Sequence, residues 1–179
     1  MSHVLWHDIE CGSYTADLAL WRELADAEAG PVLDVGAGTG RVALDLADRG
    51  HAVVALDHDA ELLSALAQRA GARAVRTVLA DARSFHLGSV FGLVLAPMQT
   101  VQLLGTQGRA QFMAAARAHL RPSGLLACAL ADALESFDDE HSEAPLPDLR
   151  EVDGVVYASR PVALRDEGGR VAIERIRET

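Results

Sequence analysis

Short, continuous runs of apolar residues alternate with amphipathic stretches along the first 131 residues of the chain. Apolar runs bounded by glycine or proline are typical of buried strands, and apolar residues spaced three and four apart indicate helices. Strands are predicted over 31–35, 52–56, 74–80, 90–96 and 124–130, and helices over 17–29, up to Arg49, around 62–70 and over about 108–120. This alternation predicts the α/β class: a doubly wound, mostly parallel, Rossmann-like sheet with helices on both faces.

The character of the chain changes after residue 131. Residues 132–153 are acidic and contain proline, and two β-prone stretches, 155–160 and 171–176, then flank the turn at Gly168 and Gly169. This pattern predicts a C-terminal β-hairpin appended to the sheet. One domain over 1–179 is therefore expected, with an N-terminal helical cap (1–30), a core (31–131), and an acidic loop and hairpin (132–179).

The charge balance excludes several functions. The chain carries 26 acidic and 16 basic residues, for a net charge of −10, and all of its basic residues except histidine are arginine. An acidic protein repels phosphate backbones, so nucleic acid is not an expected partner. Without lysine, neither a Schiff-base enzyme nor a phosphate-binding loop ending in Lys-Ser/Thr is possible.

Membrane, export and metal signals are not found in the sequence. No run approaches the length of a membrane span, and the first residues lack the plan of a signal peptide, so a cytoplasmic protein without a membrane partner is expected. Cys11 and Cys128 are too few for a disulfide framework or a zinc site. His3 and His7 are expected to lie in a frayed terminus and the acidic group over 138–143 to be solvated, so no metal is predicted.

A glycine-rich turn, Gly36-x-Gly38-x-Gly40, joins the first predicted strand to its helix. Glycines let the backbone approach a ligand closely, and free amides at the start of the helix favour a polar or anionic group, so a nucleotide-like cofactor is expected. Asp57 ends the second strand, where an acidic residue accepts hydrogen bonds from ribose hydroxyls. Arg41 stands where the dinucleotide pattern requires its third glycine, which disfavours an NAD-type oxidoreductase.

The segment from Val32 to Arg41, with Asp57 and Asp81 at the ends of the next two strands, closely resembles class I S-adenosylmethionine-dependent methyltransferases. The resemblance covers about residues 12–131 and makes 31–131 a cofactor-binding core. It implies that Asp57 holds the ribose, that Asp81 contacts the adenine amino group, and that Asp34 orients the methionine end. The implied cofactor-binding residues are Tyr14, Asp34, Gly36, Ala37, Gly38, Gly40, Arg41, Asp57, His58, Asp81, Ala82, Ala96 and Met98.

Some of these residues have structural alternatives. Asp81 could be an ordinary turn residue, and Asp59, next to His58, is expected to cap the following helix. Tyr14 lies where related enzymes fold a segment over the cofactor, and a packing role is equally open. No catalytic base is assigned, with His86, Gln99 and Tyr14 as the side chains to inspect first.

The acceptor is expected to be a small molecule, methylated on nitrogen or oxygen by in-line displacement. Enzymes that methylate exocyclic amines of bases carry Asn/Asp-Pro-Pro-Tyr/Phe after the fourth strand, where this chain has Ala96-Pro97-Met98-Gln99. The broad resemblance to small-molecule methyltransferases does not choose a substrate.

The family normally continues beyond the fifth strand with a helix and two further strands, so the sequence is expected to be truncated. An exposed strand edge would then invite pairing, and a homodimer is an open expectation. The alternative to an active enzyme is a non-catalytic or truncated scaffold that binds the cofactor, S-adenosylmethionine or its product S-adenosylhomocysteine, without turnover.

Overall fold

The computed structural model describes residues 3–131, 146–166 and 171–179. These residues form two compact units. The larger unit spans Tyr14–Leu130, and the smaller combines the described residues of 1–13 and 131–179. The segment up to residue 13 thus packs with the C-terminal strands, whereas the helix after it belongs to the larger unit.

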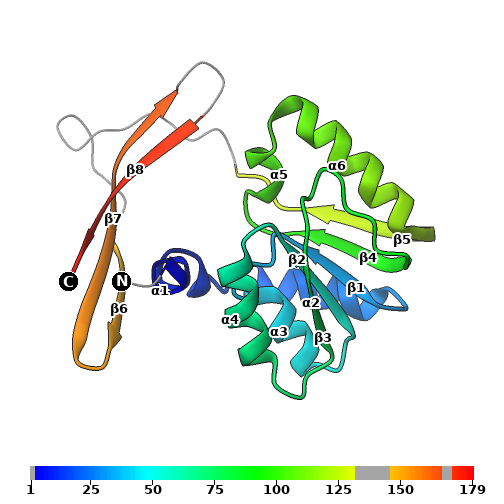
Figure 1. The fold of residues 1–179 in the computed structure, drawn as a ribbon, viewed down its shortest axis with the longest axis horizontal. Coiled ribbons are helices and arrows are strands. Elements are labelled where there is room, and N and C mark those ends of the chain that lie inside the picture. The colour runs from blue at the N-terminus through cyan, green and yellow to red at the C-terminus, as the bar shows by residue number, and fades with distance from the viewer. Residues whose placement is uncertain (1–2, 132–145, 167–170) are drawn as a thin grey trace. The chain divides into compact units, whose positions relative to one another are not determined.

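The larger unit is built on a five-stranded sheet with the order β3-β2-β1-β4-β5, in which every neighbouring pair is parallel (Figure 1). Strands β1, β2 and β4 are buried along their whole length, as the continuous apolar runs predicted. The strands are β1 (Val32–Val35), β2 (Val53–Asp57), β3 (Val75–Leu79), β4 (Phe91–Ala96) and β5 (Leu120–Cys128). The predicted doubly wound fold is confirmed.

Helices cover both faces of this sheet (Figure 1). One core contains buried side chains of α2 (Leu18–Ala27), α3 (Arg41–Asp48) and α4 (Ala60–Ala70), and the other contains those of α5 (Thr100–Leu103) and α6 (Gly105–His119). Asp59 caps α4 by accepting hydrogen bonds from the amides of Glu61 and Leu62, as predicted.

The turn predicted before the fifth strand lies inside that strand. β5 begins at Leu120, which pairs with Phe91, and its register then shifts so that Leu125 pairs with Leu93. Ser123, within the shifted segment, has a φ of 65°, which is uncommon for a residue with a side chain. The proline and glycine of this segment therefore mark a bulge rather than the strand boundary.

The smaller unit contains a three-stranded antiparallel sheet with the order β6-β7-β8. β7 (Val155–Asp166) and β8 (Val171–Glu178) form the predicted hairpin. β6 (Asp148–Val152), which precedes them, was not predicted, because its charged sequence has no strand-like apolar pattern. The predicted hairpin is thus part of a separate small sheet.

The expectation of a frayed N-terminus is wrong. Residues His3–His7 form helix α1, and Asp8–Gly12 continue as a π-helical turn, η1. Trp6 and Ile9 are buried, and the ring of Trp6 packs edge-on against Tyr157 at 5.8 Å between centroids. The terminus is ordered because its apolar side chains pack with the C-terminal sheet.

None of the helices in the described ranges is long and apolar enough to cross a membrane. The same ranges contain no group of histidine, cysteine and acidic residues that could hold a metal ion. The acidic group over 138–143 lies outside the described residues.

Candidate functional site

The glycine turn after β1 requires glycine for both conformation and space. Gly36 has a φ of 76°, and a Cβ atom there would lie 2.6 Å from Oγ1 of Thr100. Gly40 has a φ of 96°, and its Cβ would lie 2.2 Å from Cδ1 of Leu66 on α4. An alanine at either position would therefore be strained and would collide with a neighbour. The close approach also shows how the segment after β4 reaches the turn after β1.

Asp57, at the end of β2, lies against this turn. Its buried side chain accepts hydrogen bonds from the amides of Gly38, at 2.8 Å, and Asp59, at 3.0 Å. The carbonyl of Leu56 accepts from the amides of Gly36 and Ala37. The amides of Gly36, Ala37 and Gly38 thus join β1 to β2 and precede the start of α3, where the sequence predicts free amides.

Asp34, in β1, is a buried carboxyl group without a hydrogen-bond partner at either oxygen. Burial raises its pKa to about 7, against the opposing influence of the Arg41 guanidinium. The charge of Asp57 raises the pKa further, and the amide of Ala43 partly offsets the rise without forming a hydrogen bond of ordinary geometry. An orphaned carboxyl of this kind costs stability, which makes it a candidate ligand contact.

Arg41, the first residue of α3, is held by the segment before α2. Its guanidinium donates to both carboxylate oxygens of Asp17, at 2.5 and 2.8 Å, and to the carbonyl of Tyr14 at 2.8 Å. It also lies over the ring of Tyr14, 5.4 Å from the centroid. Burial favours a raised pKa for Asp17, but hydrogen bonds from Arg41 and Trp21 outweigh it and lower the pKa.

Sequence reasoning missed Asp17, because no local pattern connects it to a residue 24 positions away. Arg41, the first residue of α3, holds the backbone carbonyl of Tyr14, a residue that was predicted to lie near the cofactor. The tyrosine side chain is about half exposed. The Arg41–Asp17 pair therefore fixes where the segment preceding α2 lies relative to the glycine turn.

Asp81 follows β3, and its carboxylate is occupied by Arg83. The Arg83 guanidinium and amide both donate to it, and the guanidinium hydrogen bonds lower its pKa to about 2. Ala82 is half-buried beside it. His58 is strongly exposed, and its Nδ1 lies 3.2 Å from Asp57 Oδ1. Asp81 is thus both a turn residue and a charged group at the carboxyl end of a strand.

The segment after β4 carries an unusual backbone conformation. Met98 has a φ of 53°, and Ala96 before it is fully buried. Thr100 donates its hydroxyl to the Pro97 carbonyl at 2.9 Å, which fixes the side chain that abuts Gly36. A residue with a side chain in this region of φ is worth inspecting for function.

Because β1 to β4 are parallel neighbours, the turns after them meet at one edge of the sheet. This edge brings together the predicted residues of the glycine turn, Asp57, Asp81 and Met98. Of the three candidate bases, His86 and Gln99 are exposed, and Tyr14 is about half exposed. The His86 ring lies edge-on to His119, 5.7 Å between centroids.

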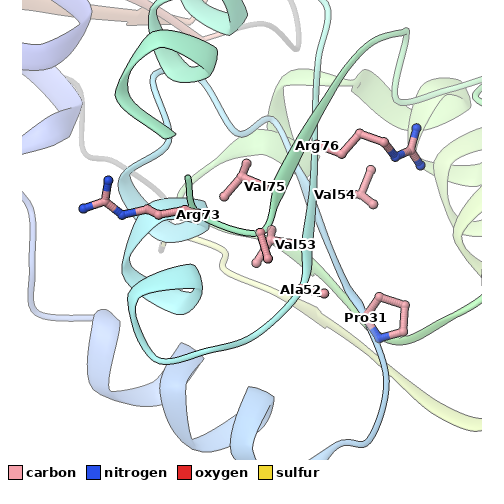
Figure 2. Close-up of a pocket in the computed structure, with 8 residues that line it drawn as sticks. Pro31, Ala52, Val53, Val54, Arg73, Val75 and Arg76 are labelled. Atoms are coloured by element: carbon pink, nitrogen blue, oxygen red, sulfur yellow. The ribbon is translucent and has the colours of Figure 1, made fainter. Parts of the chain in front are cut away.

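A shallow groove of about 380 Å³ lies at the opposite, amino-terminal edge of the strands (Figure 2). Figure 2 shows apolar side chains between two arginines, of which Arg73 pairs with Asp48 at 2.5 Å. The lining residues are Pro31, Ala52, Val53, Val54, Arg73, Ala74, Val75 and Arg76. The groove shares no residue with the predicted cofactor site.

Comparisons with known proteins show the family to which the chain belongs. The family model described as "Methyltransferase domain" matches residues 32–124, more than half of the chain. The CcbJ methyltransferase from Streptomyces caelestis is 25% identical, with a TM-score of 0.62 over 91% of this chain and 72% of that one. A sequence comparison with curated proteins gave no match.

Two further solved structures extend the likeness. The glycopeptide N-methyltransferase MtfA, complexed with S-adenosyl-L-methionine, is 28% identical, with a TM-score of 0.61 over 93% of this chain and 78% of that one. CalS10, an amino pentose methyltransferase from Micromonospora echinaspora, is 22% identical and covers 99% of this chain and 82% of its own, with a TM-score of 0.71. The chain therefore belongs to the methyltransferase-domain family and has the fold of the class I S-adenosylmethionine-dependent enzymes.

Proposed function

We propose that the protein binds S-adenosylmethionine at the carboxyl edge of β1 to β4 and transfers its methyl group to a nitrogen or oxygen atom of a small molecule. The observation that carries this proposal is the orphaned carboxyl of Asp34, buried beside the glycine turn that the family model includes. A ligand with a cationic or hydrogen-bonding group would satisfy this carboxyl.

The residues present fit such a cofactor. Gly36 and Gly40 leave no Cβ at the turn, and Asp57 and Asp81 supply carboxylates at the next two strand ends. Ribose hydroxyls would compete for Asp57, which now accepts from Gly38, and an adenine amino group would share Asp81 with Arg83. S-adenosylmethionine would supply an activated methyl group on its sulfonium.

The chain's own residues would then bind and orient. Asp34 would hold the amino-acid end, and the Arg41–Asp17 pair would keep the Tyr14 segment beside it. Met98 and the residues around it would line the place where an acceptor approaches. Holding two reactants in line accounts for a large part of the barrier reduction in such a displacement.

A small-molecule acceptor is supported by two observations. The net charge of −10 disfavours a polyanionic substrate. MtfA, at 28% identity, is described as a glycopeptide N-methyltransferase, so an amine on a compact polar molecule is a reasonable first class to screen. β5 is an outer strand of its sheet, and a homodimer through it is part of the same proposal.

Calorimetric titration of the purified protein with S-adenosylmethionine, S-adenosylhomocysteine and NAD tests the cofactor. We expect both sulfur nucleosides to bind and NAD not to bind. Gly36→Ala should weaken binding at least about tenfold, because its Cβ collides with Thr100 in a strained conformation. Gly50→Ala is the matched control, since Gly50 also has a positive φ but nothing lies within 4 Å of its Cβ.

Binding of NAD alone would contradict the proposal. Binding of the sulfur nucleosides without methyl transfer to any of a panel of amines and alcohols, followed by mass spectrometry, would favour the non-catalytic scaffold instead. Equal losses in Gly36→Ala and Gly50→Ala would show that the turn after β1 is not the binding site.

A further inference from the structure

His119 is a buried histidine that the proposed mechanism does not use. It is the last residue of α6 and is 4% exposed. Its Nε2 lies 3.0 Å from the amide nitrogen of Leu87, and its Nδ1 lies 2.7 Å from the carbonyl oxygen of Ala115. The amide can only donate and the carbonyl can only accept. The ring is therefore neutral, with its proton on Nδ1.

The segment that His119 holds is the continuation of the Asp81 turn. Phe85 is buried, and its ring lies 4.7 Å from the His119 ring between centroids. The amide of Ser84 donates to the carbonyl of Asp81 at 3.0 Å, so the turn and the held segment are directly connected. Residues 81–87 contain no helix or strand of their own.

Helix α6 supports this segment at a second point. A Cβ atom at Gly108 would lie 3.2 Å from Cδ of Arg83, so the stem of Arg83 rests on the helix. Arg83 is the residue that grips the Asp81 carboxylate. The position of Asp81 thus depends on α6 through Arg83 at one end and through His119 at the other.

We propose that His119 is a positioning residue for the cofactor site. Its neutral ring, through the hydrogen bond from the Leu87 amide, holds the segment 84–87 and with it Asp81 in place. Protonation would place an N–H on Nε2, facing the Leu87 amide, so that two donors would oppose each other. The hydrogen bond between the Leu87 amide and His119 would then be lost, and affinity for the cofactor would fall on acidification. This inference rests on the proposed function, because it assigns Asp81 to the cofactor.

Other groups titrate or carry charge near this ring. His86 contacts it edge-on, and Arg117 and Arg121 flank it in sequence, with Arg121 donating to Glu28 at 3.0 Å. Asp34 in the cofactor site also changes protonation with pH, because burial raises its pKa to about 7, so the wild-type profile alone does not isolate His119.

The test compares S-adenosylhomocysteine affinity at about pH 8 and about pH 5.5, a range in which histidine titrates, for the wild type, His119→Gln, His119→Phe and His86→Gln. Glutamine keeps an acceptor for the Leu87 amide but does not titrate, so its loss of affinity on acidification should be about fivefold to tenfold smaller than that of the wild type. Phenylalanine removes the acceptor and should weaken binding at both pH values. His86→Gln should follow the wild type.

A wild-type pH profile retained in His119→Gln would overturn the inference. Failure of the wild type to bind S-adenosylhomocysteine at any pH would instead overturn the proposed function. Hydrogen exchange would then still test whether the hydrogen bond between His119 and Leu87 depends on pH. Protection of the Leu87 amide, corrected for intrinsic exchange, should fall on acidification in the wild type but not in His119→Gln. Equal changes of protection in both proteins would show that protonation of His119 does not release the Leu87 amide.

Discussion

Two carboxyl groups, one in each unit, differ in their hydrogen bonding and in the direction of their pKa shift. In the smaller unit, Glu10 accepts hydrogen bonds from Ser159 at 2.6 Å and from two nitrogens of Arg177 at 2.8 and 2.9 Å. Burial favours a raised pKa for Glu10, but Arg177 and Ser159 outweigh it and lower the pKa. In the larger unit, Asp34 has no hydrogen-bond partner, and burial raises its pKa to about 7.

This difference distinguishes a carboxylate that stabilises the fold from one that is left without a hydrogen-bond partner and could contact a ligand. Glu10 joins η1 to β7 and β8, so its charge stabilises the small unit. Asp34 makes no such connection and destabilises the sheet that contains it whenever it is ionised. A buried carboxyl without a hydrogen-bond partner, next to a turn that requires glycine, is typical of a binding site, where stability is lost in favour of function.

The largest effect is expected for Asp34→Asn. The pKa of Asp34 is about 7 in the folded protein, against 3.8 for an unperturbed aspartate, so between these pH values the folded state binds a proton that the unfolded state does not. The free energy of unfolding of the wild type should therefore fall as pH rises from about 4 to about 7 and then level off. The asparagine of Asp34→Asn does not ionise, so the free energy of unfolding of this variant should not fall in this way. At pH 8 the variant should be more stable than the wild type by up to about 4 kcal/mol.

Urea unfolding at several pH values measures this directly. Near the low end of the range the two proteins should be almost equally stable, because Asp34 is then protonated in both states. The same substitution should weaken S-adenosylmethionine binding, since the carboxyl no longer carries a charge. A variant that is less stable than the wild type at pH 8 would show that Asp34 has a structural partner after all.

The positions of both features follow from the sequence to different degrees. The apolar runs place Asp34 inside a central strand and Asp57 and Asp81 at the ends of its neighbours, because strand period and parallel connection leave few alternatives. That Asp34 lacks a partner depends on how helices pack over it, which no local pattern contains. The glycine turn predicted a ligand but not that its amides bond to β2.

The small unit was the least predictable part. Glu10 and Arg177 are 167 residues apart, and β6 is a charged segment whose strand character comes from pairing with β7. β propensity depends strongly on context, so such a strand has no reliable signal of its own. Helix α1 (His3–His7) was missed because the burial of Trp6 depends on a distant partner, Tyr157.

The second effect, of opposite sign, is expected for Glu10→Gln. An amide nitrogen would face Arg177 and the charged hydrogen bonds would be lost, which should lower the free energy of unfolding by about 2 kcal/mol at neutral pH. Because the folded pKa of Glu10 lies below its usual 4.5, this stabilisation is present above that pH and is lost as pH falls through the folded value.

The control for this variant is Glu174→Gln, which breaks an exposed pair with Arg165 in the same sheet. Its effect should stay within about 0.5 kcal/mol in urea unfolding followed by circular dichroism. If Glu10→Gln and Glu174→Gln lowered the free energy of unfolding equally, the hydrogen bonds of Glu10 would not stabilise the small unit. The contrast between Glu10 and Asp34 would then not hold.

The smallest effect concerns Arg41, which lies near Asp34 but bonds to Asp17. Arg41→Lys keeps the positive charge but cannot keep the paired hydrogen bonds to Asp17 and the bond to the Tyr14 carbonyl, so stability should fall by about 1 kcal/mol. Arg73→Lys, at a more exposed pair with Asp48, should change stability by less than about 0.5 kcal/mol. Because lysine preserves the charge beside Asp34, the pH slope assigned to that carboxyl should persist in Arg41→Lys. Its disappearance would mean that the slope arises from the Arg41–Asp17 pair rather than from the orphaned group.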